Sequence, residues 1–237
     1  MNSNLSDPAF WSRFLFGAAA GNVARGVPLD AEGNFSMPFF TDFGVHGNVG
    51  LLDWYTVSVA VFAVCLLAAH GATYLALKTE GLVHYRSTRC AKYLWVAVVP
   101  LFVVISVESF FVRPDVPGQA VHNPVCWIGL VVVVLSTAML ISGFSSRREM
   151  RAFLASNSLI VGLLATGGAA IFPVMLHSTV APENSLSAYA TAANHRALVL
   201  ASIWWPIGFA LAIGYFIFIS RHYAGKISVK RDTQGFY

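Results

Sequence analysis

The sequence predicts an all-α protein, a polytopic transmembrane helix bundle. Of its 237 residues 57% are hydrophobic and 11% charged, whereas soluble domains carry about 25% charged residues. Residues 51–77 form an apolar run whose only charged side chain is Asp53, near its start. Such a run is long enough to span a bilayer, because a helix rises about 1.5 Å per residue and the hydrocarbon core is about 30 Å thick.

The first part of the chain predicts a short helix and then a structured loop. Ser6, Asp7 and Pro8 are typical of a helix start, and residues 9–24 are apolar but too short to cross comfortably. No basic stretch precedes them, so we expect no cleavable signal peptide. Residues 25–50 are rich in glycine, proline and aspartate, which favours a loop at the outer membrane surface. We expect its phenylalanines to pack on the protein or to lie among lipid headgroups.

Five apolar runs of sufficient length follow, and the whole chain, 1–237, is expected to be a single membrane domain. The predicted spans are 53–77, 93–112, 125–144, 153–176 and 197–220, and 221–237 is a tail. Pro100, Pro173 and Pro206 are expected to bend or end their helices.

Basic residues alternate between the connecting segments, and this pattern predicts orientation. They are concentrated in segments 78–92, 145–152 and 221–237, whereas segments 113–124 and 177–196 have one arginine each. Because basic loops stay on the cytoplasmic side, we expect a multi-pass protein of the bacterial inner membrane with a cytoplasmic C-terminus. The other segments, 25–50 included, are then outside.

Ionisable side chains within the spans are the candidates for function, since a charge in lipid costs at least about 2.5–3.5 kcal/mol near the centre. They are Asp53, His70 and Glu108, with Arg25 at the edge of the short first helix. Glu108 could belong to a proton path or bond to a neighbouring helix. His70 could relay protons, orient a cofactor in a partner, or simply bond to another helix, and Asp53 could simply cap its helix.

Other classes of site are not predicted. Cys65, Cys90 and Cys126 have no metal-ligand or haem-attachment spacing. No span offers a second histidine to match His70, so a bis-histidine haem is not expected, and no metal ligands, catalytic residues or cofactor site are assigned. The basic residues lie at the ends of apolar runs, and no aromatic residues are interleaved with them. Nucleic acid is therefore not an expected partner.

Several stretches together resemble subunit II of the cytochrome bd-type quinol oxidases, in the cyanide-insensitive branch. They are residues 21–35, 52–57, 69–72, 77–81 and 203–209, followed by Tyr215, Arg221 and His222. The resemblance extends over nearly the whole chain from about residue 17.

The resemblance implies a role in an aerobic respiratory chain. The two-subunit enzyme oxidises membrane quinol, reduces dioxygen to water and builds a proton gradient. The resemblance implies that haem b, haem d and the quinol site belong to the partner, subunit I. Subunit II then carries no cofactor, stabilises its haem-bearing partner and has no complete active site. Asp53, His70, Glu108 and Arg25 would at most line a proton path or contact that subunit.

One departure from the family leaves alternatives open. Family members are usually longer and begin with a glycine- and aspartate-rich span, so this chain resembles roughly their C-terminal two-thirds. A separate polypeptide could supply the missing spans, or the subunit could be shortened or its start placed further upstream. Two other functions are a small proton-coupled transporter using Glu108 and His70, which would require a repeat or a broken span, and a non-catalytic structural remnant of the oxidase subunit.

Overall fold

The fold is that of an all-helical membrane protein, as a computed structural model shows for residues 8–35, 37–47, 49–223 and 225–226. Within these ranges five helices are long and apolar enough to cross a membrane, which confirms the predicted fold class. They are α2 (Trp54–Lys78), α3 (Gly81–Val112), α5 (Pro124–Ser145), α6 (Glu149–Ile171) and α7 (His195–His222). Shorter elements are α1 (Pro8–Arg25), α4 (Asp115–His122), the 3-10 turn η1 (Pro182–Asn184) and strands β1 (Val174–Leu176) and β2 (Leu186–Ser187).

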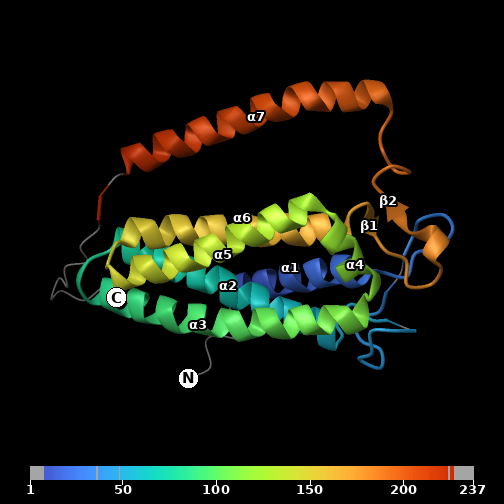
Figure 1. Cartoon of the computed structure of the whole chain (residues 1–237), viewed down its shortest axis with the longest axis horizontal. Coiled ribbons are helices and arrows are strands. Elements are labelled where there is room, and N and C mark those ends of the chain that lie inside the picture. The colour runs from blue at the N-terminus through green and yellow to red at the C-terminus, as the bar shows by residue number, and fades with distance from the viewer. Residues whose placement is uncertain (1–7, 36, 48, 224, 227–237) are drawn as a thin grey trace.

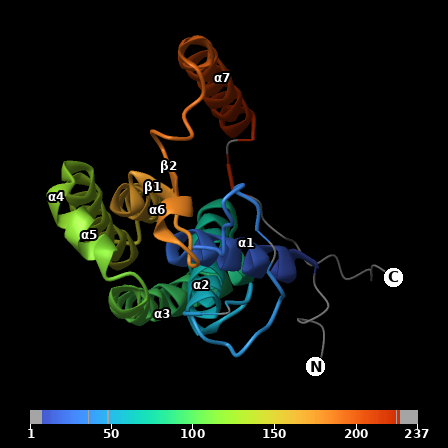
Figure 2. The same cartoon turned by 90° about the vertical axis from the view of Figure 1, so that its right-hand side faces the viewer.

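Helix α2 is the centre of the bundle. It contacts α1, α3 and α6, and α6 in turn packs along α5 (Figures 1 and 2). The main buried cluster joins small and large side chains of these helices, with Ala69 of α2, Ala91 and Trp95 of α3, and Ala155 of α6 among them. Small residues let helix backbones approach closely, which is how helices associate in lipid.

Several element boundaries differ from those expected. Helix α3 already begins at Gly81, so most of segment 78–92 is helical, and segment 113–124 contains α4. Helix α6 ends at Ile171, before Pro173, and 174–176 form a strand paired antiparallel with β2. Pro100 and Pro206 lie inside continuous helices. Hydropathy reports the lipid-embedded part of a helix, so a polar extension such as 81–92 is missed.

The loop 25–50 is held by its backbone and by buried valines at both ends, Val45 and Val49 included, and not by its phenylalanine rings. Val27 forms a bridge with Ser178, and Val27 and Leu29 are buried. Phe35, Phe39, Phe40 and Phe43 are exposed. Packing of these rings on the protein is therefore not seen, and placement at headgroup level stays a prediction.

The described parts of the three basic segments, 78–92, 145–152 and 221–226 without 224, lie at one end of the bundle. The α2–α3 and α5–α6 connections and the C-terminal end of α7 are together at the left of Figure 1, whereas α4, β1 and β2 lie at the opposite end. We call these the basic end and the outer end. All basic segments can therefore face one side of a membrane, as the positive-inside pattern requires.

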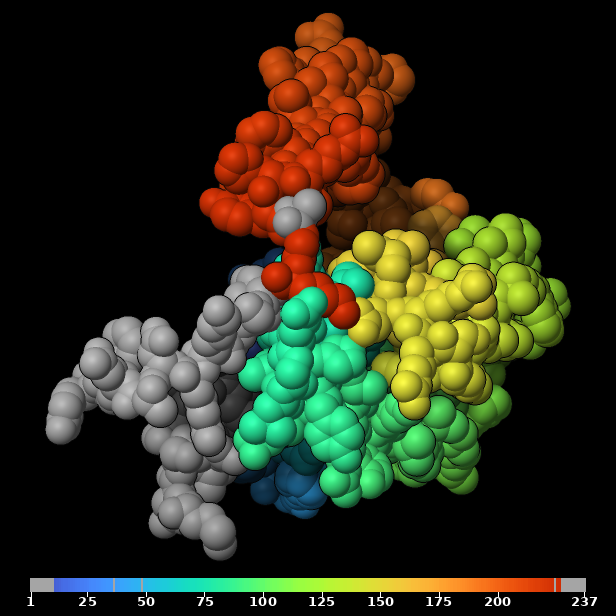
Figure 3. Space-filling model, turned by 90° about the vertical axis from the view of Figure 1, so that its left-hand side faces the viewer, coloured from blue at the N-terminus to red at the C-terminus, as the bar shows by residue number. Residues whose placement is uncertain are grey.

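Helix α7 stands apart from the other helices (Figures 1 and 3). Nearly all of its residues are exposed, and many of them are large and apolar. Near the basic end, Lys78 Nζ donates to the Tyr223 carbonyl at 3.1 Å and Lys226 pairs with Glu149 at 2.6 Å. The apolar length of α7 is therefore left to be covered by lipid or by another polypeptide.

The α5–α6 crossing offers a direct test of the close packing. A Cβ added to Gly143 would lie 2.7 Å from the backbone N of Ala152 and 2.9 Å from its Cα. We expect Gly143→Ala to lower the free energy of unfolding by about 1–3 kcal/mol, because rigid backbone must move. Gly168→Ala, a matched control in α6 with open space around it, should be neutral or slightly stabilising. Thermal unfolding in detergent measures both, and equal effects would contradict the packing.

Candidate functional site

The outer end contains a buried ion pair between Arg25, the last residue of α1, and Asp53, which precedes α2. Arg25 Nη1 donates to Asp53 Oδ2, and the two side chains are 1% and 0% exposed. The same guanidinium group donates to the Gly50 carbonyl at 3.0 Å and to Asn22 Oδ1 at 2.6 Å. The pair therefore joins the end of one helix to the start of the next and holds the loop between them.

Asp53 is also the N-cap of α2. Its Oδ1 accepts from the Thr56 backbone N–H at 2.8 Å, and its own N–H donates to Thr56 Oγ1 at 2.9 Å. This reciprocal arrangement is a capping box, which satisfies backbone donors that a helix start leaves unpaired. The capping role expected for Asp53 is thus present, whereas nothing in the sequence pattern indicated that Arg25 is its partner.

Glu108 lies on α3 and faces α2. Ser58 Oγ donates to Glu108 Oε1 at 3.0 Å, whereas Glu108 Oε2 is buried and has no hydrogen-bond partner among the described residues. Beside it, Tyr55 and Ser109 share a hydrogen bond of 3.1 Å between their hydroxyl groups. A carboxylate oxygen, a serine and a tyrosine hydroxyl thus line one stretch of the α2–α3 interface, where they can accept and donate protons.

His70 lies nearer the basic end, apart from the other three candidates. Its Nδ1 is 2.9 Å from Ser156 Oγ of α6, and its ring stacks on Phe153 at 5.5 Å between centroids. The structure therefore brings Arg25 and Asp53 together, places Glu108 on the neighbouring α2–α3 interface, and gives His70 a hydrogen bond to another helix.

The ring of His70 is held by Ser156 and Phe153, and His70 does not line either of the two larger cavities. Among the described residues, no group of three or more histidine, cysteine or acidic side chains is placed to hold a metal ion.

A second cluster at the outer end was not anticipated from the sequence. Arg113, the C-cap residue that follows α3, donates to Asp115 at 2.8 and 2.6 Å and to the Ala24 carbonyl at 3.4 Å. Arg113, Arg25 and His177 line a cavity of about 230 Å³. The only available signal was that 113–124 has a single arginine, close to an aspartate.

Two pKa values in this cluster are shifted from their ordinary values. The hydrogen bonds from Arg113 lower the pKa of the Asp115 carboxyl group. Burial lowers the pKa of His177, and the charge of Arg113 lowers it further, while Asp115 acts in the opposite sense. The folded state thus favours neutral His177, whereas the unfolded chain protonates it near its ordinary value of about 6.5.

We expect the stability of the outer end to fall as the pH is lowered from 7 to 5. The unfolded chain takes up a proton at His177 before the folded one does, so acid favours unfolding. His177→Gln should flatten this part of the pH profile, whereas His122→Gln, an exposed histidine of α4, should leave it unchanged. Melting temperatures measured across the pH range test this, and an unaltered profile in His177→Gln would contradict it.

The fold and the buried ionisable groups define a class: a multi-pass helical membrane protein with polar groups between its spans. Within that class the chain belongs to the cytochrome bd terminal oxidase subunit II family, whose family model matches residues 8–222. The chain is 23% identical to "Probable cytochrome oxidase subunit 2" of Haemophilus influenzae over 92% of its own length and 63% of that protein. It is 22% identical to "Cytochrome bd-I ubiquinol oxidase subunit 2" of Escherichia coli K12, over 76% and 53% respectively.

The match thus covers only part of each relative's length. The chain spans between about half and two-thirds of each of these two relatives, while most of the chain itself is matched. The family match confirms the predicted resemblance to subunit II of cytochrome bd oxidase.

Proposed function

We propose that this chain is the haem-free subunit II of a bd-type quinol:dioxygen oxidoreductase and stabilises a haem-bearing subunit I. The complex would oxidise quinol, reduce oxygen to water and build a proton gradient. The observation that carries the proposal is the family match over residues 8–222. Haem b, haem d and quinol would be bound by the partner, which supplies the redox chemistry.

The exposed apolar helix supports a role in assembly. Helix α7 presents large apolar side chains along its length and has little contact with the bundle. In a membrane, lipid or an apolar partner helix can cover such a surface. Subunit I is the partner that the proposal assigns, and a separate polypeptide that supplies further spans is a second possible neighbour of this face.

Within the chain we propose different roles for the four candidate residues. Arg25 and Asp53 fix the outer ends of α1 and α2, because their charges are buried and mutually satisfied. His70 joins α2 to α6 through Ser156. Glu108 is proposed as the proton-handling group, since one of its carboxylate oxygens has no partner among the described residues and lies between two helices.

The proposed location is the bacterial inner membrane with the C-terminal end of α7 in the cytoplasm. The argument is the placement of the basic segments at one end of the bundle. Basic loops remain on the cytoplasmic side during insertion, so the outer loop and the β1–β2 hairpin would face the opposite side.

The test is loss of function in the native host. Deleting the gene should abolish quinol-driven oxygen consumption that survives cyanide, and a plasmid copy should restore it. Unchanged cyanide-resistant respiration in the deletion strain, with any second oxidase of this type also deleted, would contradict an essential role in the oxidase. It would favour the non-catalytic alternative.

A further inference from the structure

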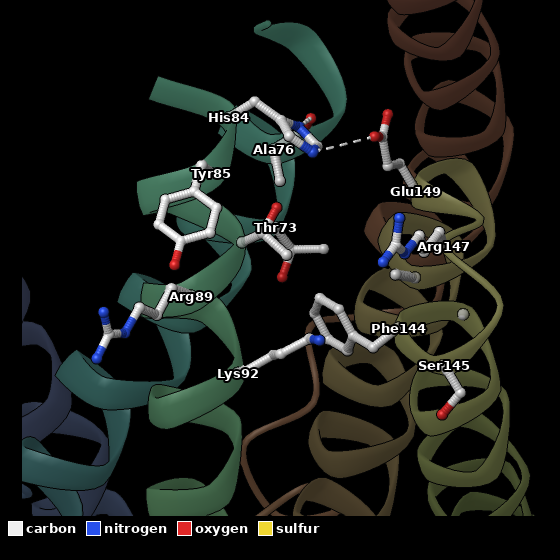
Figure 4. Close-up of a pocket in the computed structure, with 13 residues that line it drawn as sticks. Thr73, Ala76, His84, Tyr85, Arg89, Lys92, Phe144, Ser145, Arg147 and Glu149 are labelled. Atoms are coloured by element: carbon white, nitrogen blue, oxygen red, sulfur yellow. Dashed lines mark hydrogen bonds and ion pairs between the residues drawn. The ribbon is translucent and has the colours of Figure 1, made fainter. Parts of the chain in front are cut away.

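The basic end contains a cavity of about 680 Å³ between α2, α3 and the α5–α6 connection. Arg89 and Lys92 line it from α3, and Arg147 and Glu149 from the opposite side (Figure 4). It therefore gathers three cations around one carboxylate at the basic end of the bundle.

The carboxylate is already neutralised. Lys226 Nζ lies 2.6 Å from Glu149 Oε2, and His84 Nε2 lies 3.5 Å from Oε1. No described residue forms an ion pair with Lys92, Arg147 or Arg89, and Arg89 interacts with Tyr93 by a 3.5 Å hydrogen bond and over its ring. The cavity thus retains uncompensated positive charge, which favours an anion.

Two further features of the lining suit a phosphate group. Thr88 Oγ1 is buried and has no hydrogen-bond partner among the described residues. Helix α6 begins at Glu149, which lines the cavity, and Arg148 gives it no side-chain cap, so the first backbone N–H groups of α6 have no capping side chain. A hydroxyl donor, helix N–H groups and arginine side chains are the partners that phosphate oxygens accept from in proteins.

An apolar groove continues from this cavity along the bundle. It has a volume of about 510 Å³ and lies between α3 and α5, which have no extensive contact of their own. Val96, Val99 and Phe102 line one side, and Leu140 and Ile141 the other. Lys92, Phe144 and Ser145 line both spaces, and Figure 4 shows the Lys92 side chain extending from α3 toward Phe144.

From this arrangement we propose that the basic end binds an acidic phospholipid, with its phosphate headgroup in the cavity and an acyl chain in the α3–α5 groove. A polar, positively charged space joined to an apolar groove matches one amphiphile and neither free phosphate nor a plain hydrocarbon. A zwitterionic headgroup would bring its own cation against Lys92 and Arg147, so the site discriminates by charge. The site stands independently of the proposed oxidase role.

Native mass spectrometry of the full chain, purified in mild detergent with whatever partners it retains, measures the binding. Dioleoylphosphatidylglycerol should bind about tenfold more tightly than dioleoylphosphatidylcholine, as expected for a basic pocket near the membrane surface. Lys92→Gln/Arg147→Gln should remove this preference. Arg86→Gln/Arg148→Gln, two basic residues of the same end outside the cavity lining, should keep it.

The groove is tested separately. Val99→Phe should weaken binding of the acidic lipid by filling the groove, whereas Val103→Phe, on the same helix outside the lining, should not. Inorganic phosphate should compete poorly with the lipid in the unmodified chain. Equal binding of the two lipids by the unmodified chain, displacement by inorganic phosphate at equal concentration, or a retained quinone in place of phospholipid would each overturn the proposal.

Discussion

Asp53→Asn is expected to lower the free energy of unfolding by about 3–5 kcal/mol, the usual cost of removing one partner of a buried ion pair. The asparagine oxygen can still cap α2 by accepting from the Thr56 N–H. The lower free energy of unfolding is therefore due to the missing charge and not to a missing cap. Arg25 would stay buried, bonded to the Gly50 carbonyl and Asn22 but without a counter-ion.

A double-mutant cycle isolates the pair. Arg25→Met should cost a similar amount, since it leaves the Asp53 carboxylate buried alone, and the double variant Arg25→Met/Asp53→Asn should cost clearly less than the sum of the single effects. Asp42→Asn is the control, because Asp42 is an exposed aspartate of the outer loop whose bond to the Gly44 N–H an asparagine can keep.

Denaturant unfolding in detergent micelles measures these free energies, and protease sensitivity of the segment after Arg25 is a second readout. We expect faster cleavage there in both single variants, because the guanidinium group holds the loop at Gly50. Additive single effects, with an Asp42→Asn cost as large as that of Asp53→Asn, would contradict a coupled buried pair.

Glu108→Gln is the second change with a large expected effect, here on turnover. The amide oxygen can still accept the hydrogen bond of Ser58, so the fold should be retained. A glutamine cannot take up and release a proton at this position. If Glu108 carries protons in the assembled oxidase, quinol-driven oxygen consumption should fall at least about tenfold. Positioned proton-transfer groups typically contribute about 10²–10⁴-fold to a rate, so tenfold is a lower limit for the expected loss.

Glu183→Gln is the matched control, since Glu183 is an exposed carboxylate at the outer end. Oxygen consumption by membranes that contain equal amounts of assembled complex, judged by haem absorbance, is the readout. Glu108→Asp should recover part of the activity by restoring a titrating group. Full activity in Glu108→Gln would assign Glu108 to helix packing through Ser58.

The fold class could be predicted because hydropathy and charge are properties of each segment alone. Residues 53–77 have one charge in a long apolar run, and α2 occupies nearly the same range. The start of α3 could not be found in this way, because residues 81–92 are helical but polar. The separation of α7 from the other helices could not be predicted either, because its composition resembles that of the packed spans.

The candidate site was predicted as single residues and not as an arrangement. An ionisable residue inside an apolar run can be recognised in a sequence, so Asp53, Glu108 and His70 could be chosen as candidate site residues. Their partners could not: Arg25 and Asp53 are joined across a loop, and Ser156 reaches His70 from another helix. Arg113 and His177 were not predicted as site residues, because they lie in connecting segments, where hydropathy does not distinguish one polar residue from another. Folding brings both to the cavity that Arg25 also lines.

The most direct measurement is the haem content of the complex that this chain forms in its own membrane. The chain, tagged and purified from its host in mild detergent, should bring down a second polypeptide, a reduced-minus-oxidised haem difference spectrum and quinol-dependent oxygen consumption. The same chain expressed without that partner should show no haem absorbance. Haem bound by the isolated chain, or a tagged chain that retains neither haem nor oxidase activity, would contradict the assignment.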